Sequence, residues 1–124
     1  MKIRVIVVRP KKKAVVEMIE DKLDTYQELV GGRICEFDPF YRYEAEKKYN
    51  AVFLCNDDGH YSGYPKCRLL FDMGGFPESV IYGTFVIVKY KPGDENYSSL
   101  DDEEIEYFMN LFLFPHPFLE DDEW

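Results

Sequence analysis

The segment that begins at Leu100 constrains the fold more than any other part of this 124-residue chain. Asp101 and Glu104 have the D-x-x-E spacing of a capping box, and Leu100 is placed to pack on Ile105 as a hydrophobic staple. The apolar residues that follow have the i, i+3, i+4, i+7 spacing of one helix face: Ile105, Phe108, Met109 and Phe112. Pro115 stops the helix. We therefore expect a helix over residues 101–113 that packs on a sheet.

Runs of β-branched and aromatic residues predict the strands of that sheet. Residues 3–8 and a return strand over residues 14–19 are expected to form a hairpin with a basic tip. Further strands are expected over residues 33–37 and 51–55, and residues 68–71 form a brief apolar piece. Residues 80–90 are expected to be the longest strand, in which Gly83 permits a bulge or a close backbone approach.

A second, shorter helix is expected over residues 21–30. Asp21 and Asp24 sit where the first amides need acceptors, and Gly31 and Gly32 end the helix because glycine adopts the left-handed conformation at little cost. Together the elements predict an α+β fold: a mostly antiparallel curved sheet of about five to six strands with two helices. The predicted organisation is a single domain over residues 1–113 and an acidic, aromatic C-terminal tail over residues 114–124.

Charge is divided unevenly along the chain. Residues 94–124 contain eleven acids and no Lys or Arg, whereas the first 93 residues have a net charge of +2. A segregated acidic end repels nucleic acid and membranes and attracts basic protein surfaces. No apolar run reaches the ~20 residues that span a bilayer, and three widely spaced cysteines fit a reducing compartment. We expect a soluble, cytoplasmic protein.

No catalytic or metal motif is evident, so no catalytic residue, metal or cofactor is predicted. Cys55, His60 and Cys67 could be zinc ligands with Cys35 or Asp57 as the fourth, but paired C-x(2–4)-C knuckles are missing. A Cys55–His60 nucleophile pair lacks an orienting third group. The bland interpretation, buried free cysteines and a solvated turn histidine, is favoured, and we expect no stoichiometric zinc.

Two binding alternatives remain open. In the first, a small-molecule or nucleotide-binding module or an enzyme, residues 11–13, Arg68 and the loop at Gly74 and Gly75 face a phosphate. In the second, residues 40–48 bind DNA or RNA through interleaved aromatic and basic side chains: Tyr41, Arg42, Tyr43, Lys47 and Lys48, with Tyr49 beside them. The sequence pI of about 4.7 opposes the second alternative, because phosphate contacts dominate nucleic-acid affinity.

Four sequence pieces, in their order, resemble one small family. They are Leu23 with Glu28-Leu29-Val30-Gly31-Gly32-Arg33-Ile34, then Cys55-Asn56-Asp57-Asp58-Gly59, then Gly83-Thr84-Phe85-Val86-Ile87-Val88, and finally Ser99-Leu100-Asp101-Asp102-Glu103-Glu104-Ile105. The family is a domain of unknown function carried mostly by phages, plasmids and conjugative elements of bacteria, and the resemblance covers roughly residues 1–112. Where it usually has Pro-x-Asn-Arg, this chain has Pro65-Lys66-Cys67-Arg68, so Cys67 replaces the Asn.

The resemblance implies a mobile-element accessory protein in the cytoplasm of a bacterial host and supplies no activity. Combined with the acidic end, it leads us to expect a non-enzymatic protein that binds another protein, and the candidate partner is a host defence component with a basic surface. Nucleic-acid and membrane partners are not expected. The candidate partner-binding residues are Asp101, Asp102, Glu103, Glu106, Phe118, Glu120, Asp121, Asp122, Glu123, Trp124, Tyr41 and Tyr43.

Overall fold

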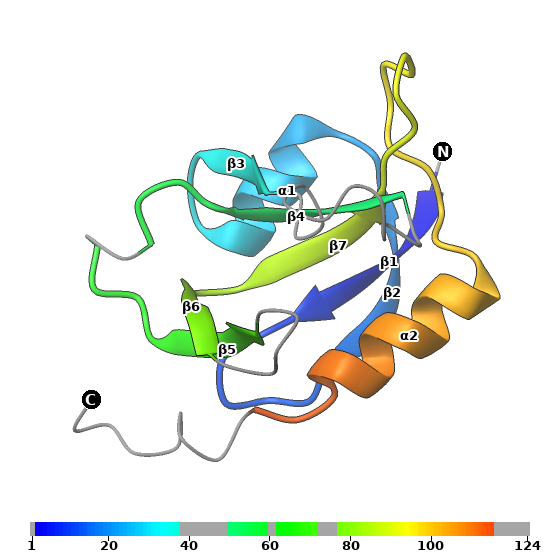
Figure 1. Ribbon diagram of the computed structural model, residues 1–124. Coiled ribbons are helices and arrows are strands. Elements are labelled where there is room, and N and C mark those ends of the chain that lie inside the picture. The colour runs from blue at the N-terminus through cyan, green and yellow to red at the C-terminus, as the bar shows by residue number, and fades with distance from the viewer. Residues whose placement is uncertain (1, 38–49, 60–61, 72–76, 116–124) are drawn as a thin grey trace.

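The computed structural model describes residues 2–37, 50–59, 62–71 and 77–115. Within these ranges the chain forms seven strands and two helices (Figure 1). The strands are β1 (Lys2–Val8), β2 (Val15–Glu20), β3 (Ile34–Phe37), β4 (Ala51–Asn56), β5 (Lys66–Phe71), β6 (Pro77–Tyr82) and β7 (Phe85–Lys89). The helices are α1 (Leu23–Val30) and α2 (Asp102–Phe112). The predicted single α+β domain is confirmed.

Five of the strands form one antiparallel sheet in the order β2-β1-β7-β4-β3, and β5 pairs with β6 in a separate two-stranded sheet. The predicted hairpin is present, because β1 pairs with β2 in a register that places Ile3 opposite Ile19. β7, the last strand in the described part of the chain, lies in the middle of the main sheet between β1 and β4. The N-terminal and central parts of the sheet are therefore joined by a strand that comes late in the sequence.

Both faces of the main sheet are buried, and a different helix covers each (Figure 1). The α1 face contains Ile3, Val5, Val7, Val52, Leu54, Val86 and Val88, together with Tyr26 and Val30 of the helix. The opposite face contains Ile6, Val8, Ala51, Phe53, Phe85 and Ile87, packed against Phe108 and Phe112 of α2 and against Cys67 and Ile81 of the small sheet. Alternate residues of the central strands enter different cores, as the two-residue period of a strand requires.

Aromatic rings join α2 to the sheet. The ring centroid of Phe53 lies 5.5 Å from that of Phe112 and 6.0 Å from that of Phe108, both in edge-on geometry. Phe85 also meets Phe112 edge-on at 5.5 Å. Such contacts add about 0.5–1.5 kcal/mol each beyond the burial of apolar area. The apolar helix face predicted from sequence is the face that packs on the sheet.

The expected long strand over residues 80–90 is wrong. The chain forms two strands there, β6 in the small sheet and β7 in the main sheet, and Gly83 turns between them with a φ of 77°. A Cβ at Gly83 would lie 2.8 Å from the Tyr64 ring, so the turn also needs the small size of glycine. Residues 66–71, expected to be only a brief apolar piece from 68, form the complete strand β5.

The start of α1 also differs from the prediction. The helix begins at Leu23, its N-cap is Lys22, and no side chain caps it. Asp21 instead accepts a hydrogen bond of 2.6 Å from the Tyr26 hydroxyl. The predicted glycine end of the helix is confirmed, because Gly31 adopts a left-handed φ of 82° and its amide donates to the Gln27 carbonyl. Of the two glycines, Gly31 has the positive φ and Gly32 does not.

The start of α2 confirms the predicted capping box. Asp101 Oδ1 accepts from the Glu104 amide at 2.9 Å, and Glu104 Oε1 accepts from the Asp101 amide at 3.0 Å. The end of α2 depends on a side chain that is far away in the sequence. Arg68 is 2 % exposed and its Nε donates to the Phe112 carbonyl at 2.9 Å.

Candidate functional site

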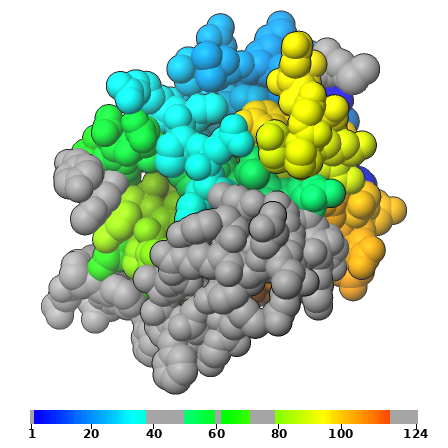
Figure 2. Space-filling model, turned by 45° about the horizontal axis from the view of Figure 1, so that its top comes forward, coloured from blue at the N-terminus to red at the C-terminus, as the bar shows by residue number. Residues whose placement is uncertain are grey.

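The acidic residues of α2 and of the segment before it occupy one side of the molecule. Asp94, Glu95, Asp102, Glu103 and Glu106 are all exposed. In Figures 1 and 2 the loop that contains Asp94 and Glu95 (yellow) and α2 (orange) follow the same side. We call these five residues the acidic surface. It brings together part of the candidate partner-binding set.

The candidate residues of the acidic end do not all have the same role. Asp102 pairs with Arg4 at 2.9 Å, but its side chain is 95 % exposed and keeps most of its contact with solvent. Asp101 and the buried Glu104 both bind Lys89, with Nζ to oxygen distances of 3.4 Å and 3.0 Å. Asp101 and Glu104 therefore form the start of the helix, and Asp101, although 57 % exposed, is engaged by the capping box and by Lys89.

The charges around Lys89 shift two pKa values. The hydrogen bond from the Glu104 amide, helped by Lys89, lowers the pKa of Asp101. Desolvation of Lys89 opposes its protonation, but its hydrogen bonds and charge attraction to Glu104 and Asp101 outweigh desolvation and raise its pKa. Both shifts favour the charged forms, so Lys89 and Asp101 stay charged across the neutral range.

The other candidate partner-binding residues lie outside the described residues. They are Tyr41, Tyr43, Phe118, Glu120, Asp121, Asp122, Glu123 and Trp124. The same holds for the alternative nucleic-acid segment at residues 40–48, for His60 and for the Gly74 and Gly75 loop. The predicted roles of these residues stay predictions.

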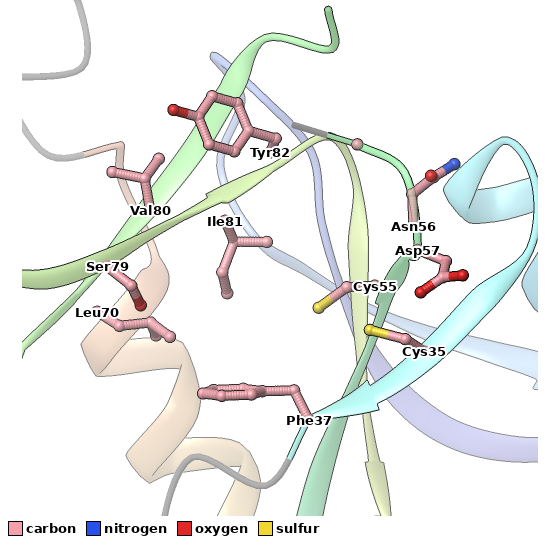
Figure 3. A pocket seen from close by; sticks show the side chains of 11 residues that line it. Cys35, Phe37, Cys55, Asn56, Asp57, Leu70, Ser79, Val80, Ile81 and Tyr82 are labelled. Atoms are coloured by element: carbon pink, nitrogen blue, oxygen red, sulfur yellow. The ribbon is translucent and has the colours of Figure 1, made fainter. Parts of the chain in front are cut away.

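A pocket of about 250 Å³ lies between the β3–β4 edge of the main sheet and the small β5–β6 sheet (Figure 3). Most of its wall is apolar. The lining residues are Cys35, Phe37, Cys55, Asn56, Asp57, Gly59, Leu70, Ser79, Val80, Ile81 and Tyr82. A cavity of about 150 Å³ with apolar walls is large enough for benzene, so this pocket can hold a small apolar group.

Cys35 and Cys55 lie directly opposite each other in the β3–β4 ladder, and Figure 3 shows both sulfur atoms in the pocket wall. The Asp57 amide donates to the Arg33 carbonyl at 2.9 Å, two residues away on each strand, so the ladder alternation makes Cys35 and Cys55 a hydrogen-bonded pair. Burial raises the pKa of the Cys35 thiol and raises that of Cys55 to about 12. Both thiols are protonated and weakly nucleophilic at neutral pH.

The polar side chains at one end of the pocket have structural partners. Asn56 Nδ2 donates to the Val30 carbonyl at the end of α1 at 2.9 Å, while its Oδ1 accepts from the Asp58 amide at 2.7 Å. Asp57 Oδ2 pairs with Arg33 at 2.9 Å. Asn56 and Asp57 are therefore both engaged by the fold, and Ser79 is a further polar residue of the pocket lining.

Two side chains named in the sequence-based site hypotheses, Arg68 and Cys67, are buried and bonded to backbone carbonyls. Arg68, proposed to face a phosphate, is buried and donates to the carbonyls of Phe112, Arg9, Cys67 and Lys12. Cys67, a candidate zinc ligand, is fully buried and its thiol donates to the Val8 carbonyl at 3.5 Å. Within the described ranges, no three His, Cys, Asp or Glu side chains come together in a way that would hold a metal ion.

Sequence reasoning missed the pocket, because its walls come from two sheets whose relative placement has no local signal. That Cys35 and Cys55 lie opposite each other follows from the β3–β4 register, which the sequence does not specify. Neither α1 nor α2 has the length and apolar character needed to cross a bilayer, and they are the only helices in the described part of the chain.

Comparisons with known proteins give a family but no activity. No curated protein and no solved structure matches the chain. A family model does match, over residues 1–113, which include both helices and all seven strands. The four sequence pieces quoted above fall inside this match, and the predicted membership of a family of unknown function is confirmed. The chain belongs to the family described as Domain of unknown function (DUF3846).

Proposed function

We propose that this chain is a non-enzymatic accessory protein of a phage or another bacterial mobile element, and that it acts by binding a host defence protein through its acidic surface. The observation that carries the proposal is the exposure of Asp94, Glu95, Asp102, Glu103 and Glu106 on one side of the molecule. The fitting partner is a protein with a basic surface.

The energetics of the acidic side support a binding role for its outer residues. Asp101 and Glu104 stabilise the helix start and Asp102 also pairs with Arg4, yet Asp102 is 95 % exposed and its charge still faces solvent. Acids crowded on one side raise the repulsion within the folded state, and a basic partner relieves it. Charge complementarity of this kind mainly accelerates association and makes it sensitive to salt.

The test compares two double variants in capture from a bacterial host lysate. Glu95→Gln with Glu106→Gln removes two charges from the acidic surface. Asp24→Asn with Glu28→Gln removes two exposed charges from α1, which covers the other face of the sheet. We expect mass spectrometry to find a protein that is retained by wild type and by the α1 variant and is lost, or strongly reduced, with the acidic-surface variant.

Association kinetics with the captured partner then give the decisive measurement. The acidic-surface variant is expected to associate more slowly than wild type at low salt and to show a flatter salt dependence. Equal rates for the two double variants would contradict the proposal. Melting temperatures of both variants serve as the folding control, and we expect them to match wild type.

The acids of the C-terminal tail are tested separately. Replacing Glu120, Asp121, Asp122 and Glu123 with Gln or Asn removes four charges without touching the capping box. The proposal expects slower partner association and an unchanged melting temperature. Unchanged association at low and moderate salt would remove these four acids from the proposed interface.

The pocket favours a second candidate function, the binding of a small apolar molecule. About 250 Å³ of space, walls that include Phe37, Leu70 and Ile81, and the polar groups of Asp57 and Ser79 at its margin are the usual elements of a small-ligand site. Arg68 does not serve the phosphate site considered from sequence, because backbone carbonyls engage its guanidinium group.

A fluorescent apolar probe, anilinonaphthalene sulfonate, tests the pocket. Wild type is expected to enhance its fluorescence at a single saturable site. Ile81→Trp fills the pocket and should abolish this signal, whereas Leu111→Trp, at a position 52 % exposed on α2, should preserve it. A saturable signal that Ile81→Trp leaves intact, or no saturable signal for wild type, would rule out a pocket of this kind.

A further inference from the structure

The two edges of the main sheet differ in length and in exposure. β3 is the shorter edge, with four residues, and three of them are half-buried. β2 has six residues, and no other strand in the described part of the chain pairs with its outer side. Val15, Val16 and Met18 of β2 are 38 %, 42 % and 55 % exposed. Apolar side chains are thus concentrated on the longer open edge.

Natural edge strands are usually protected against pairing with another chain by lysine, proline, a bulge or a very short strand. β2 (VVEMIE) contains no lysine or proline, and its register with β1 is continuous from Val15 to Glu20. Its central charged residue, Glu17, pairs with Arg9 at 2.9 Å. The sequence of this strand therefore favours pairing on its open side.

We propose that β2 binds β2 of a second copy of this chain in antiparallel orientation, which joins two five-stranded sheets into one continuous sheet. The charge pattern selects this partner and this orientation. Residues 11–13 before the strand are all lysine, while residues 20–24 at its other end contain the three acids Glu20, Asp21 and Asp24 against the single base Lys22. Antiparallel pairing sets the basic end of one copy against the acidic end of the other, and parallel pairing would set like charges together.

Symmetry restricts the register. A two-fold axis perpendicular to the sheet places one residue opposite its own copy. Glu17 at that position would set two carboxylates opposite each other, which is unfavourable. Val16 on the axis would leave only residues 15–17 of each strand paired, whereas Met18 on the axis pairs residues 16–20. The geometry points to Met18 on the axis, with Val16 opposite Glu20 of the second copy.

The contact is formed mainly by one strand from each copy. Interfaces of this size are at the low end of specific association, so we expect a concentration-dependent equilibrium between monomer and dimer instead of an obligate dimer. Val16 and Met18 pair with Ile6 and Arg4 of β1, so they lie on the α2 side of the sheet. Dimerisation buries both side chains near the axis.

Site-directed cross-linking tests the register. Met18→Cys should give a covalent dimer with a short bis-maleimide, because the two introduced cysteines face each other across the axis. Leu23→Cys is the matched control: it is 58 % exposed but lies far from its own copy in this arrangement. Wild type controls for the native cysteines. Cross-linking of Met18→Cys no stronger than that of Leu23→Cys would overturn the register.

Sedimentation across a range of concentrations tests the dimer itself. Met18→Lys places two like charges at the axis and should leave the protein monomeric, while Met18→Leu should preserve the dimer. Circular dichroism and the melting temperature establish that both variants are folded. Wild type that stays monomeric up to its highest soluble concentration, or Met18→Lys that dimerises as wild type does, would overturn the proposal.

Discussion

The two helices begin by different means. α2 starts with a complete capping box formed by residues within the same turn, and its N-cap side chain also reaches Lys89. α1 starts with Lys22 and no side-chain cap, and Asp21 holds Tyr26 instead of a helix amide. One start is specified by four consecutive residues. The other depends on packing of Tyr26 and Val30 against the sheet.

The ends of the two helices, in contrast, are alike. The carbonyl of Phe112 in α2 accepts from Arg68, and the carbonyl of Val30 in α1 accepts from Asn56. Tyr64 adds a bond from its hydroxyl to the Gly31 carbonyl at 2.9 Å. Each helix end is therefore held by a strand or loop residue more than 25 positions away, and α1 has in addition the local turn at Gly31.

The largest effect should come from removing the support at the end of α2. Arg68→Leu leaves buried carbonyls of Phe112, Cys67 and Lys12 without their donor, and we expect a loss of roughly 3 kcal/mol or more in unfolding free energy. Urea denaturation measures it. Arg33→Leu is the control. The Arg33 side chain is 79 % exposed and pairs with Asp57 at the surface, so its removal should cost less than about 1 kcal/mol. Similar losses for the two would mean that Arg68 does not hold the helix end.

The end of α1 is tested at its glycines. Gly31→Val forces a β-branched residue into a left-handed φ and brings its Cβ to 2.9 Å from the Tyr64 hydroxyl, so a cost above about 2 kcal/mol is expected. Gly93→Val, also at positive φ but with nothing within 4 Å, isolates the backbone strain and should cost less. Gly32→Val should likewise be milder, because Gly32 lacks a positive φ. Thermal denaturation that ranks Gly32→Val above Gly31→Val would contradict this assignment.

A smaller effect should distinguish the two helix starts. Asp101→Asn keeps an oxygen for the cap but removes the charge that faces Lys89. Because the folded protein lowers the pKa of Asp101, its charge contributes stability above the unfolded pKa of about 3.9, and this contribution is lost as pH falls through the folded pKa.

Asp101→Asn should therefore be less stable than wild type at neutral pH, and the two should converge in acid. Asp24→Asn, in the first turn of the uncapped α1, is the matched variant and should stay close to wild type throughout. Stability curves between pH 7 and pH 2 check both. A constant difference between Asp101→Asn and wild type over this range would show that the charge has no role.

The smallest effect is expected at Asp21. Asp21→Asn still accepts from the Tyr26 hydroxyl, so its stability should fall by less than about 1 kcal/mol. Burial, followed by the hydrogen bond to Asp21, raises the pKa of Tyr26, so the phenol stays protonated and can donate at neutral pH. Urea denaturation at neutral pH measures the loss. A loss as large as that of Arg68→Leu would contradict this ranking.

The parts of the fold that were predictable are those with local signals. The capping box at Asp101, the β1–β2 hairpin and the glycine end of α1 each follow from a few adjacent residues. The split of residues 80–90 into β6 and β7 was not predictable, because Gly83 alone fits both a bulge and a turn. What decides the matter is the ring of Tyr64, 19 positions earlier, which lies against Gly83.

Less of the site was predictable. The exposure of Glu103 and Glu106 follows from their places on the polar side of α2, but the burial of Glu104 depends on its bond to Lys89 in β7. The pocket depends on the distance between two sheets. The hydrogen bonds of Arg68 depend on the end of α2 and the β1–β2 turn meeting at its guanidinium group. These features depend on tertiary contacts, which the periodicity of a single sequence does not predict.

The central place of β7 has a consequence for the order in which a ribosome delivers the chain. When residues 1–84 have emerged, β1 and β4 have been synthesised but β7, which pairs with both, has not. Each of these two strands then has one side without a hydrogen-bonded neighbour. The β1–β2 hairpin and the β3–β4 pair can form early from nearby residues, whereas the complete sheet requires contacts across about 80 positions. Completion near the end of synthesis leaves a late interval in which apolar strand edges are available to chaperones or to self-association.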